Sequence, residues 1–181
     1  KAKETGLHAI DAPVSGGDIG AKNGTLSIMV GGEKEDFDAC LPVLQAMGTN
    51  IIHTGGPGCG QHIKMANQIS GLGCLAGVCE AIAYTRAVGM DVDTMIQCVA
   101  PGASGSWHMT NTAPRIQKGD LGSGFYIKHY VKDLNIALAE AQAKGLELPM
   151  LEELLSMYKK LLEEGLGEQG TQSLIKCYET K

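Results

Sequence analysis

One lysine lies where a lysine side chain can take part in proton transfer. Lys64 follows a glycine-rich stretch, Gly55–Gly60, and falls in the first turn or so of a long predicted helix. The N-terminal end of a helix carries partial positive charge, which disfavours the charged form of a lysine and attracts a carboxylate. Lys64 is therefore a candidate acid/base residue that exchanges a proton with a substrate hydroxyl. From position alone, the alternative is an ordinary surface lysine.

Two groups of polar residues could hold a substrate beside this lysine. Asn67 and Gln68 follow it by three and four positions, so either amide can share its helix face. Ser15, Gly16 and Gly17 follow a predicted strand, where N–H groups and a hydroxyl can form a small anion-binding concavity. The alternatives are a polar contact at the helix start and an ordinary turn after the strand.

A third set lies further along the chain. Phe125 precedes the adjacent pair Lys132 and Asp133 near the start of another predicted helix. On the bare sequence the pair is an exposed charged pair and Phe125 is a core residue. These three become site candidates only through the family resemblance described below.

The predicted elements divide the chain near residue 60. The first part is mixed α/β, with predicted strands at 9–14, 26–30 and 51–53 and a predicted helix at 35–47 that ends at Gly48. The second part is all helical, with predicted helices at 63–88, 93–99, 130–145 and 151–164 and an Asp93 cap on the second of these. We therefore predict two domains, residues 1–60 and 61–181.

The long helix raises the question of a membrane. It is apolar almost all round, which predicts burial on most faces, and Gly73 and Gly77 form a GxxxG pattern. Its uninterrupted weakly polar stretch runs only over residues 69–79, which is too short to span a bilayer. We expect a buried helix and no membrane partner.

Composition excludes other classes of function. The 181 residues are 44% hydrophobic and carry a net charge of −5, with scattered lysines and arginines that do not favour nucleic-acid binding. The six cysteines show no CxxC pair and no metal-ligand spacing with the histidines, which favours reduced thiols in a cytoplasmic protein without a metal site. With no apolar leader and no initiating Met, we expect a cut chain and not a whole gene product.

Three stretches resemble the β-hydroxyacid dehydrogenase family, which includes 3-hydroxyisobutyrate dehydrogenase and tartronate semialdehyde reductase. The first is Asp11–Gly17 (DAPVSGG), continued by Gly20–Ala21, Gly24–Leu26 and Met29–Gly32. The second is Gly56–Gln61 leading into Lys64–Gln68, and the third is Phe125 followed by Lys132–Leu134. They follow the family's order and approximate spacing.

The resemblance implies a fold that is mostly α with a small α/β remnant. The last strands of a Rossmann-type domain would be joined by one long interdomain helix to an all-helical C-terminal domain like that of 6-phosphogluconate dehydrogenase. It also implies an NAD(P)-dependent oxidoreductase that interconverts a small 3-hydroxy acid and its semialdehyde, and a homodimer or homotetramer formed through the helical domain.

By the same resemblance, Lys64 is the acid/base residue and Ser15, Gly16 and Gly17 hold the substrate carboxylate. Family members often have Asn at the fourth place after the lysine. This sequence has Gln68 there and Asn67 at the third place, a pattern closer to the tartronate semialdehyde reductase branch. Which amide orients the substrate is left open, with Asn67 favoured.

For the third stretch, the resemblance implies that Lys132 approaches the nicotinamide end of the cofactor. Asp133 would orient polar groups around it, and Phe125 would close the pocket.

The family's opening GxGxxG turn is not found in this sequence, because Gly56–Gln61 lacks its final glycine and a complete βαβ unit. We therefore expect the pyrophosphate site, and the choice of NAD or NADP, to lie upstream of Lys1, and the isolated chain to turn over little. Two alternatives remain. One is a non-catalytic helical dimerisation module, and the other is a 6-phosphogluconate dehydrogenase relative, which would need several cationic residues near its pocket.

Overall fold

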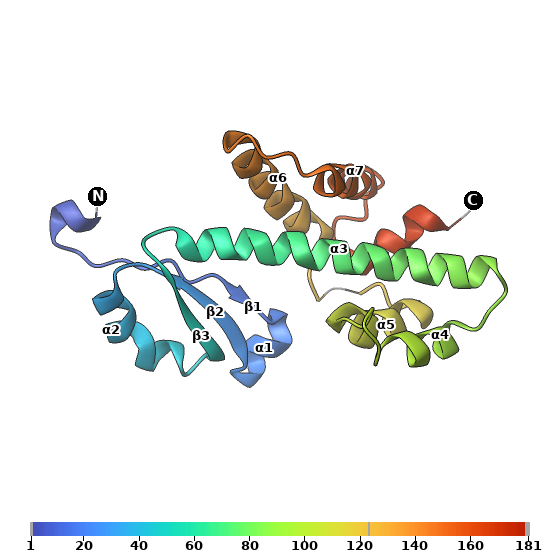
Figure 1. Cartoon of the computed structure of the whole chain (residues 1–181), viewed down its shortest axis with the longest axis horizontal. Coiled ribbons are helices and arrows are strands. Elements are labelled where there is room, and N and C mark those ends of the chain that lie inside the picture. Colours follow the sequence, from blue (N-terminus) through green and yellow to red (C-terminus); the bar gives the residue numbers. More distant parts are fainter. Residues whose placement is uncertain (1, 123, 180–181) are drawn as a thin grey trace. The chain divides into compact units, whose positions relative to one another are not determined.

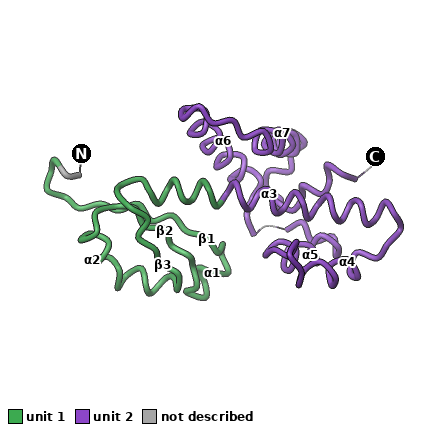
Figure 2. Tube along the Cα trace, in the orientation of Figure 1, with its two compact units in different colours: residues 1–67 green, residues 68–181 purple. Residues whose placement is uncertain are grey.

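The computed structural model describes residues 2–122 and 124–179 and divides into two compact units. The first, Lys1–Asn67, is the α/β unit, and the second, Gln68–Lys181, is the helical unit (Figure 2). The division falls inside a helix that begins at Cys59. The expected domain boundary at residues 60 and 61 lies at the start of that same helix and stays a prediction.

The α/β unit contains a three-stranded sheet in the order β1-β2-β3 (Figure 1). Strand β1 pairs with β2 antiparallel, and β2 pairs with β3 parallel across the connection that contains α2. The elements are η1 (Ala2–Thr5), β1 (Val14–Ser15), α1 (Gly17–Asn23), β2 (Leu26–Gly31), α2 (Lys34–Leu44) and β3 (Gly48–Gly55). This mixed arrangement agrees with the expected remnant of a Rossmann-type domain.

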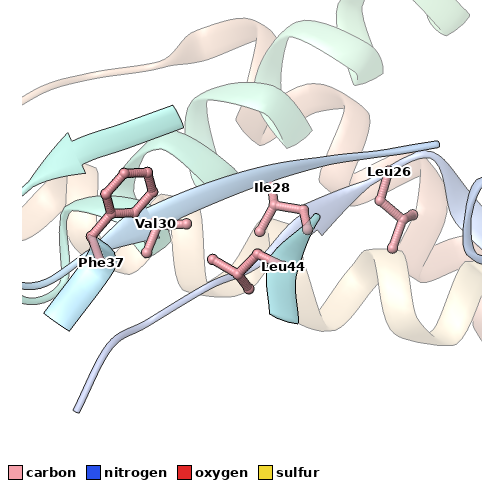
Figure 3. Close-up of a cluster of buried hydrophobic side chains, with 5 residues drawn as sticks. All are labelled: Leu26, Ile28, Val30, Phe37 and Leu44. Carbon is pink, nitrogen blue, oxygen red and sulfur yellow. The ribbon is translucent and has the colours of Figure 1, made fainter. Parts of the chain in front are cut away.

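The core of the α/β unit lies between β2 and α2 (Figure 3). Leu26, Ile28 and Val30 occupy alternate positions of β2, so their side chains leave the strand on the same face. Phe37 and Leu44, seven residues apart on α2, pack against them. Each such buried side chain contributes about 1.5–3 kcal/mol. This cluster fixes the sheet against the helix that follows it.

Two predictions for this unit were wrong in detail, and one helix was missed. The expected strand at 9–14 pairs as a strand only from Val14, after an isolated bridge at Asp11, because Pro13 has no N–H to donate to a ladder. Helix α2 ends at Leu44, and Gly48 is the first residue of β3, where an added β-carbon would lie 2.3 Å from the Leu26 carbonyl oxygen. Helix α1 was not predicted.

The helical unit is built around the long helix α3 (Cys59–Ala87), which begins in the α/β unit (Figure 1). The further elements are α4 (Val92–Val99), η2 (His108–Thr112), α5 (Ala113–Gln117), α6 (Ile127–Ala143), α7 (Pro149–Glu163) and η3 (Thr171–Tyr178). Helices α6 and α7 pack against each other. The core of this unit includes Leu72, Ile82, Leu134 and Tyr158, which are fully buried.

Helix α3 is buried on one face only, whereas its apolar character predicted burial on most faces. Leu72, Leu75 and Cys79 are buried, but Cys74 is exposed and Tyr84 is 70% exposed. Among the described residues, no helix is long and apolar enough to cross a membrane.

Other details of the helical unit also differ from the sequence prediction. The N-cap of α4 is Asp91, whose carboxylate accepts the Thr94 N–H, and not Asp93. The π-helical turn η2, α5 and the 3-10 segment η3 were not predicted, because short elements lack the repeated apolar spacing that marks a long helix.

Candidate active site

The side chain of Lys64 contacts strand β1, which follows the isolated bridge at Asp11. Lys64 is the sixth residue of α3, in the second turn, and its Nζ donates a hydrogen bond of 2.9 Å to the Val14 carbonyl oxygen. The side chain is half-buried. Its amine is therefore held next to Ser15, the residue that the sequence analysis placed in the same site.

The Ser15-Gly16-Gly17 segment is the junction between β1 and α1. Ser15 is half-buried, whereas Gly16 and Gly17 are exposed. Gly16 has φ 129° and Gly17 has φ 62°, and both values favour glycine because a β-carbon is strained there. The junction therefore presents open backbone beside the carbonyl that binds Lys64, which is compatible with a small anion.

The N-terminal end of α3 is occupied by a carboxylate of the chain itself. Asp11 Oδ1 accepts the Gly58 N–H at 2.6 Å, and Asp11 Oδ2 accepts the Gln61 N–H at 2.9 Å. These two amides are not available to a substrate carboxylate, so the expectation that the helix end attracts one is wrong for them. These two amides are likewise not available to a cofactor pyrophosphate.

The two amides after Lys64 lie in different surroundings. Asn67 is half-buried in the last position of the α/β unit. Gln68 is only 6% exposed and belongs to the helical unit, where its Nε2 donates to Asp133 Oδ2 at 2.7 Å. The side chain of Gln68 is thus engaged in the interior of the helical unit.

The residues of the third stretch meet on α6 and just before it. Lys132 Nζ lies 2.8 Å from Asp133 Oδ1, and the lysine side chain is 65% exposed while the aspartate is 11% exposed. Phe125 is 37% exposed and meets the Tyr130 ring edge-on at a centroid distance of 5.4 Å. The structure therefore groups Gln68, Lys132, Asp133 and Phe125 within the helical unit.

Tyr130 belongs to this group and was missed as a site candidate. Its hydroxyl donates to the Gln68 carbonyl oxygen at 3.1 Å, and burial raises the pKa of Tyr130 well above its usual range. The sequence carried a usable signal, because Tyr130 precedes Asp133 by three positions and so shares its helix face. A buried tyrosine hydroxyl also needs a partner.

His108 approaches α3 at the same residue as Tyr130, namely Gly71. A β-carbon added to Gly71 would lie 3.9 Å from Tyr130 Oη and 4.0 Å from His108 Nε2. His108 Nδ1 is 3.0 Å from Thr112 Oγ1 within the π-helical turn η2, and burial lowers the pKa of His108.

The lowered pKa of His108 predicts a loss of stability in mild acid. Because the folded protein binds the imidazole proton more weakly than the unfolded chain, the destabilisation begins as the pH falls through about 6.5 and levels off below the folded pKa. We expect His108→Asn to reduce this dependence when urea unfolding is compared at pH 7 and pH 5. An unchanged difference between the two pH values would contradict the assignment.

Among the described residues, no three His, Cys, Asp or Glu side chains are grouped so that they could hold a metal ion. The six cysteines are all unpaired. Burial raises the pKa of the Cys79 thiol to about 12, so this thiol is protonated at neutral pH.

Two family models cover almost the whole chain. Residues 58–178 match the model described as NAD-binding of NADP-dependent 3-hydroxyisobutyrate dehydrogenase, and residues 1–55 match the NAD binding domain of 6-phosphogluconate dehydrogenase. The two matches meet just before α3.

Similar proteins agree with these models. An uncharacterized oxidoreductase of Bacillus subtilis is 50% identical over 98% of this chain and 62% of its own length. The 2-hydroxy-3-oxopropionate reductase of Escherichia coli is 35% identical over 99% of this chain and 61% of its own length. The 3-hydroxyisobutyrate dehydrogenase of Mycobacterium tuberculosis, solved with L-serine, superposes with a TM-score of 0.90 at 26% identity, over 99% of this chain and 64% of that one. The chain thus spans about three fifths of the length of each of these proteins.

Proposed function

The chain belongs to the β-hydroxyacid dehydrogenase family, and on that premise we propose that the whole protein is an NAD(P)-dependent oxidoreductase. It interconverts a small 3-hydroxy acid and its semialdehyde. The observation that supports this best is the 2.9 Å contact from Lys64 Nζ to the Val14 carbonyl oxygen, beside the Ser15–Gly17 junction. A proton-transferring amine on α3 and a site for a carboxylate at the junction of β1 and α1 would then lie side by side in the α/β unit.

In the proposed mechanism, Ser15, Gly16 and Gly17 hold the substrate carboxylate through the serine hydroxyl and backbone N–H groups. The Lys64 amine accepts the proton of the substrate hydroxyl during oxidation and returns it during reduction. Release from the Val14 carbonyl lets the amine turn to the substrate. When bound, the nicotinamide cofactor accepts or supplies the hydride.

Asn67 is the better of the two candidate amides for orienting the substrate hydroxyl. It follows Lys64 by three positions, so both side chains share a face of α3 within the same unit. Gln68 instead donates its amide to Asp133 in the interior of the helical unit. Gln68 remains the second candidate.

The helical unit offers residues that fit one end of a nicotinamide cofactor. Lys132 is 65% exposed and Phe125 is 37% exposed, so a cation and a ring are open to a ligand. Asp133, bonded to both Gln68 and Lys132, would fix the lysine in place. We propose that the pyrophosphate is bound by a part of the protein outside this chain, because the turn before α3 is closed by Asp11.

A phosphosugar substrate, as in 6-phosphogluconate dehydrogenase, is less compatible with the charges of this chain. The chain contains two arginines, and both pair with carboxylates of the helical unit. Arg86 pairs with Glu179, and Arg115 pairs with Asp120. In the α/β unit, Lys22 pairs with Asp18, and Lys34 pairs with Asp38. Each of these four cations already faces a carboxylate of the chain itself, whereas a sugar phosphate is bound by cations that point at it.

A non-catalytic helical dimerisation module remains the alternative from another class. The exposed side chains of Cys74 and Tyr84 on α3 favour assembly through the helical unit, and we propose a homodimer or homotetramer on this ground. Assembly and catalysis are compatible, so only an activity measurement separates the two functions.

The test is a turnover assay of the full-length gene product with NAD and NADP. Three substrates are tested for oxidation, namely 3-hydroxyisobutyrate, L-serine and 6-phosphogluconate. A fourth, 2-hydroxy-3-oxopropionate, is tested for reduction. The absorbance of the reduced cofactor follows turnover in both directions. We expect turnover of at least one 3-hydroxy acid and a loss of about 10²-fold or more for its methyl ester, because the ester lacks the charge that the Ser15–Gly17 junction binds. Turnover of 6-phosphogluconate alone, or of none, would overturn the proposal.

A further inference from the structure

Asp11 differs from an ordinary helix cap because both its backbone and its carboxylate form hydrogen bonds to distant parts of the chain. Its backbone pairs with Gly31 in both directions, with N–H···O distances of 2.9 and 2.8 Å. From this fixed point the side chain reaches 47 and 50 residues along the sequence to the amides of Gly58 and Gln61. One residue therefore joins the end of β2 to the start of α3.

Two glycines make room for this carboxylate. A β-carbon at Gly31 would lie 2.5 Å from Asp11 Oδ1 and 2.7 Å from the Gly60 nitrogen. A β-carbon at Gly60 would lie 2.6 Å from Asp11 Oδ2 and 2.4 Å from the Met29 carbonyl oxygen. All four distances are too short for a real β-carbon, so the contact requires glycine at both positions.

The same segment meets α3 a second time through Lys64. Asp11 and Val14 are separated only by Ala12 and Pro13, and Pro13 restricts the backbone between them. On the helix, Gln61 and Lys64 are three residues apart, close to one turn. The segment from Asp11 to Ser15 is thus bonded to α3 at two successive turns, by the carboxylate and by the Val14 carbonyl.

From this geometry we infer that Asp11 is a positioning residue for Lys64. Asp11 holds the start of α3 against residues 11–15. It thereby sets the position of the Lys64 amine relative to the Ser15–Gly17 junction. This inference rests on the proposed function, in which that amine moves the substrate proton. A cap with a purely structural role would stabilise the fold but would not act through the lysine.

A double-mutant cycle separates these two roles in the full-length gene product. Asp11→Ala removes both acceptors, whereas Asp11→Asn keeps one carbonyl oxygen and so retains one of the two bonds. We expect Asp11→Ala to lower kcat/KM about 10- to 100-fold, since misplacement by about 1 Å can cost about 10²-fold. The loss falls mainly on kcat, and Asp11→Asn recovers part of it.

The second half of the cycle uses Lys64→Ala with activity restored by a soluble primary amine. A free amine is not positioned by Asp11, so adding Asp11→Ala in this background should change the rescued rate less than about twofold. Asp38→Ala is the matched control, because Asp38 forms an exposed pair with Lys34 on α2 and contacts neither segment. Hydrogen exchange of the peptide spanning 56–66 shows whether each variant keeps the start of α3 folded.

The outcomes are distinct. Equal losses for Asp11→Ala in both backgrounds, or no loss in either, would overturn the positioning role while leaving the proposed function intact. Undiminished turnover of Lys64→Ala would overturn the proposed function, and the role of Asp11 with it.

Discussion

Lys64→Ala is expected to lower kcat of the full-length protein by about 10²- to 10⁴-fold, the range that general acid–base catalysis contributes. KM for the hydroxy acid should change far less, because in the proposed mechanism the Ser15–Gly17 junction, and not the amine, binds the carboxylate. Steady-state kinetics with saturating cofactor provide the measurement. Lys64→Arg should be as inactive as Lys64→Ala, because a guanidinium keeps its proton at any usable pH.

The matched control for this variant is Lys22→Ala. Lys22 lies on α1 in the same unit, with 75% of its side chain exposed and an i,i+4 pairing to Asp18. We expect its kcat and KM to stay within about twofold of the wild-type values, since exposed pairs of this kind contribute little. If Lys64→Ala and Lys22→Ala had equal activity, the lysine would have no part in proton transfer.

Gly60→Ala should destabilise the α/β unit by about 2–4 kcal/mol, the upper range for forcing a methyl group into a packed site. The added β-carbon would overlap the Met29 carbonyl oxygen at 2.4 Å and the Asp11 carboxylate at 2.6 Å. The gain in helix propensity is only about 1 kcal/mol and cannot offset this overlap. Hydrogen exchange of peptides from β2 and β3 measures the local loss, which a global melt of a two-unit chain would not isolate.

Gly56→Ala is the comparison for Gly60→Ala. Gly56 lies four residues earlier, in the turn before α3, with a negative φ and no atom within 4 Å of an added β-carbon. The expected change in stability is within about 0.5 kcal/mol, as for most open surface positions. Equal destabilisation by the two variants would show that the tight packing around the Asp11 carboxylate does not exist in solution.

The sequence predicted the long helix, the helical second part and the proximity of Lys64 to Ser15. Each of these follows from a repeated local pattern or from a family motif. The helices α6 and α7 were predictable for the same reason, because Leu134, Tyr158 and their neighbours recur at helical spacing.

The role of Asp11 could not be predicted in this way. Its partners are backbone amides 47 and 50 residues away, and a backbone N–H has no sequence signature. Gly48 was misread for a related reason, since a glycine after a helical pattern usually ends the helix and here it makes room for the Leu26 carbonyl oxygen. The burial of α3 was overestimated because the apolar character of a helix does not show which of its faces packs against other elements.

The raised pKa of Cys79 has a practical consequence. Thiolate is the species that alkylating reagents attack, and Cys79 is fully buried and protonated at neutral pH, while Cys74 and Cys98 are exposed. A reagent will therefore label Cys74 and Cys98 on the native protein and reach Cys79 only after the helical unit opens. Labelling of Cys79 thus reports the opening of the helical unit. Cys74, five residues earlier on the same helix, labels in the folded state and serves as its internal reference.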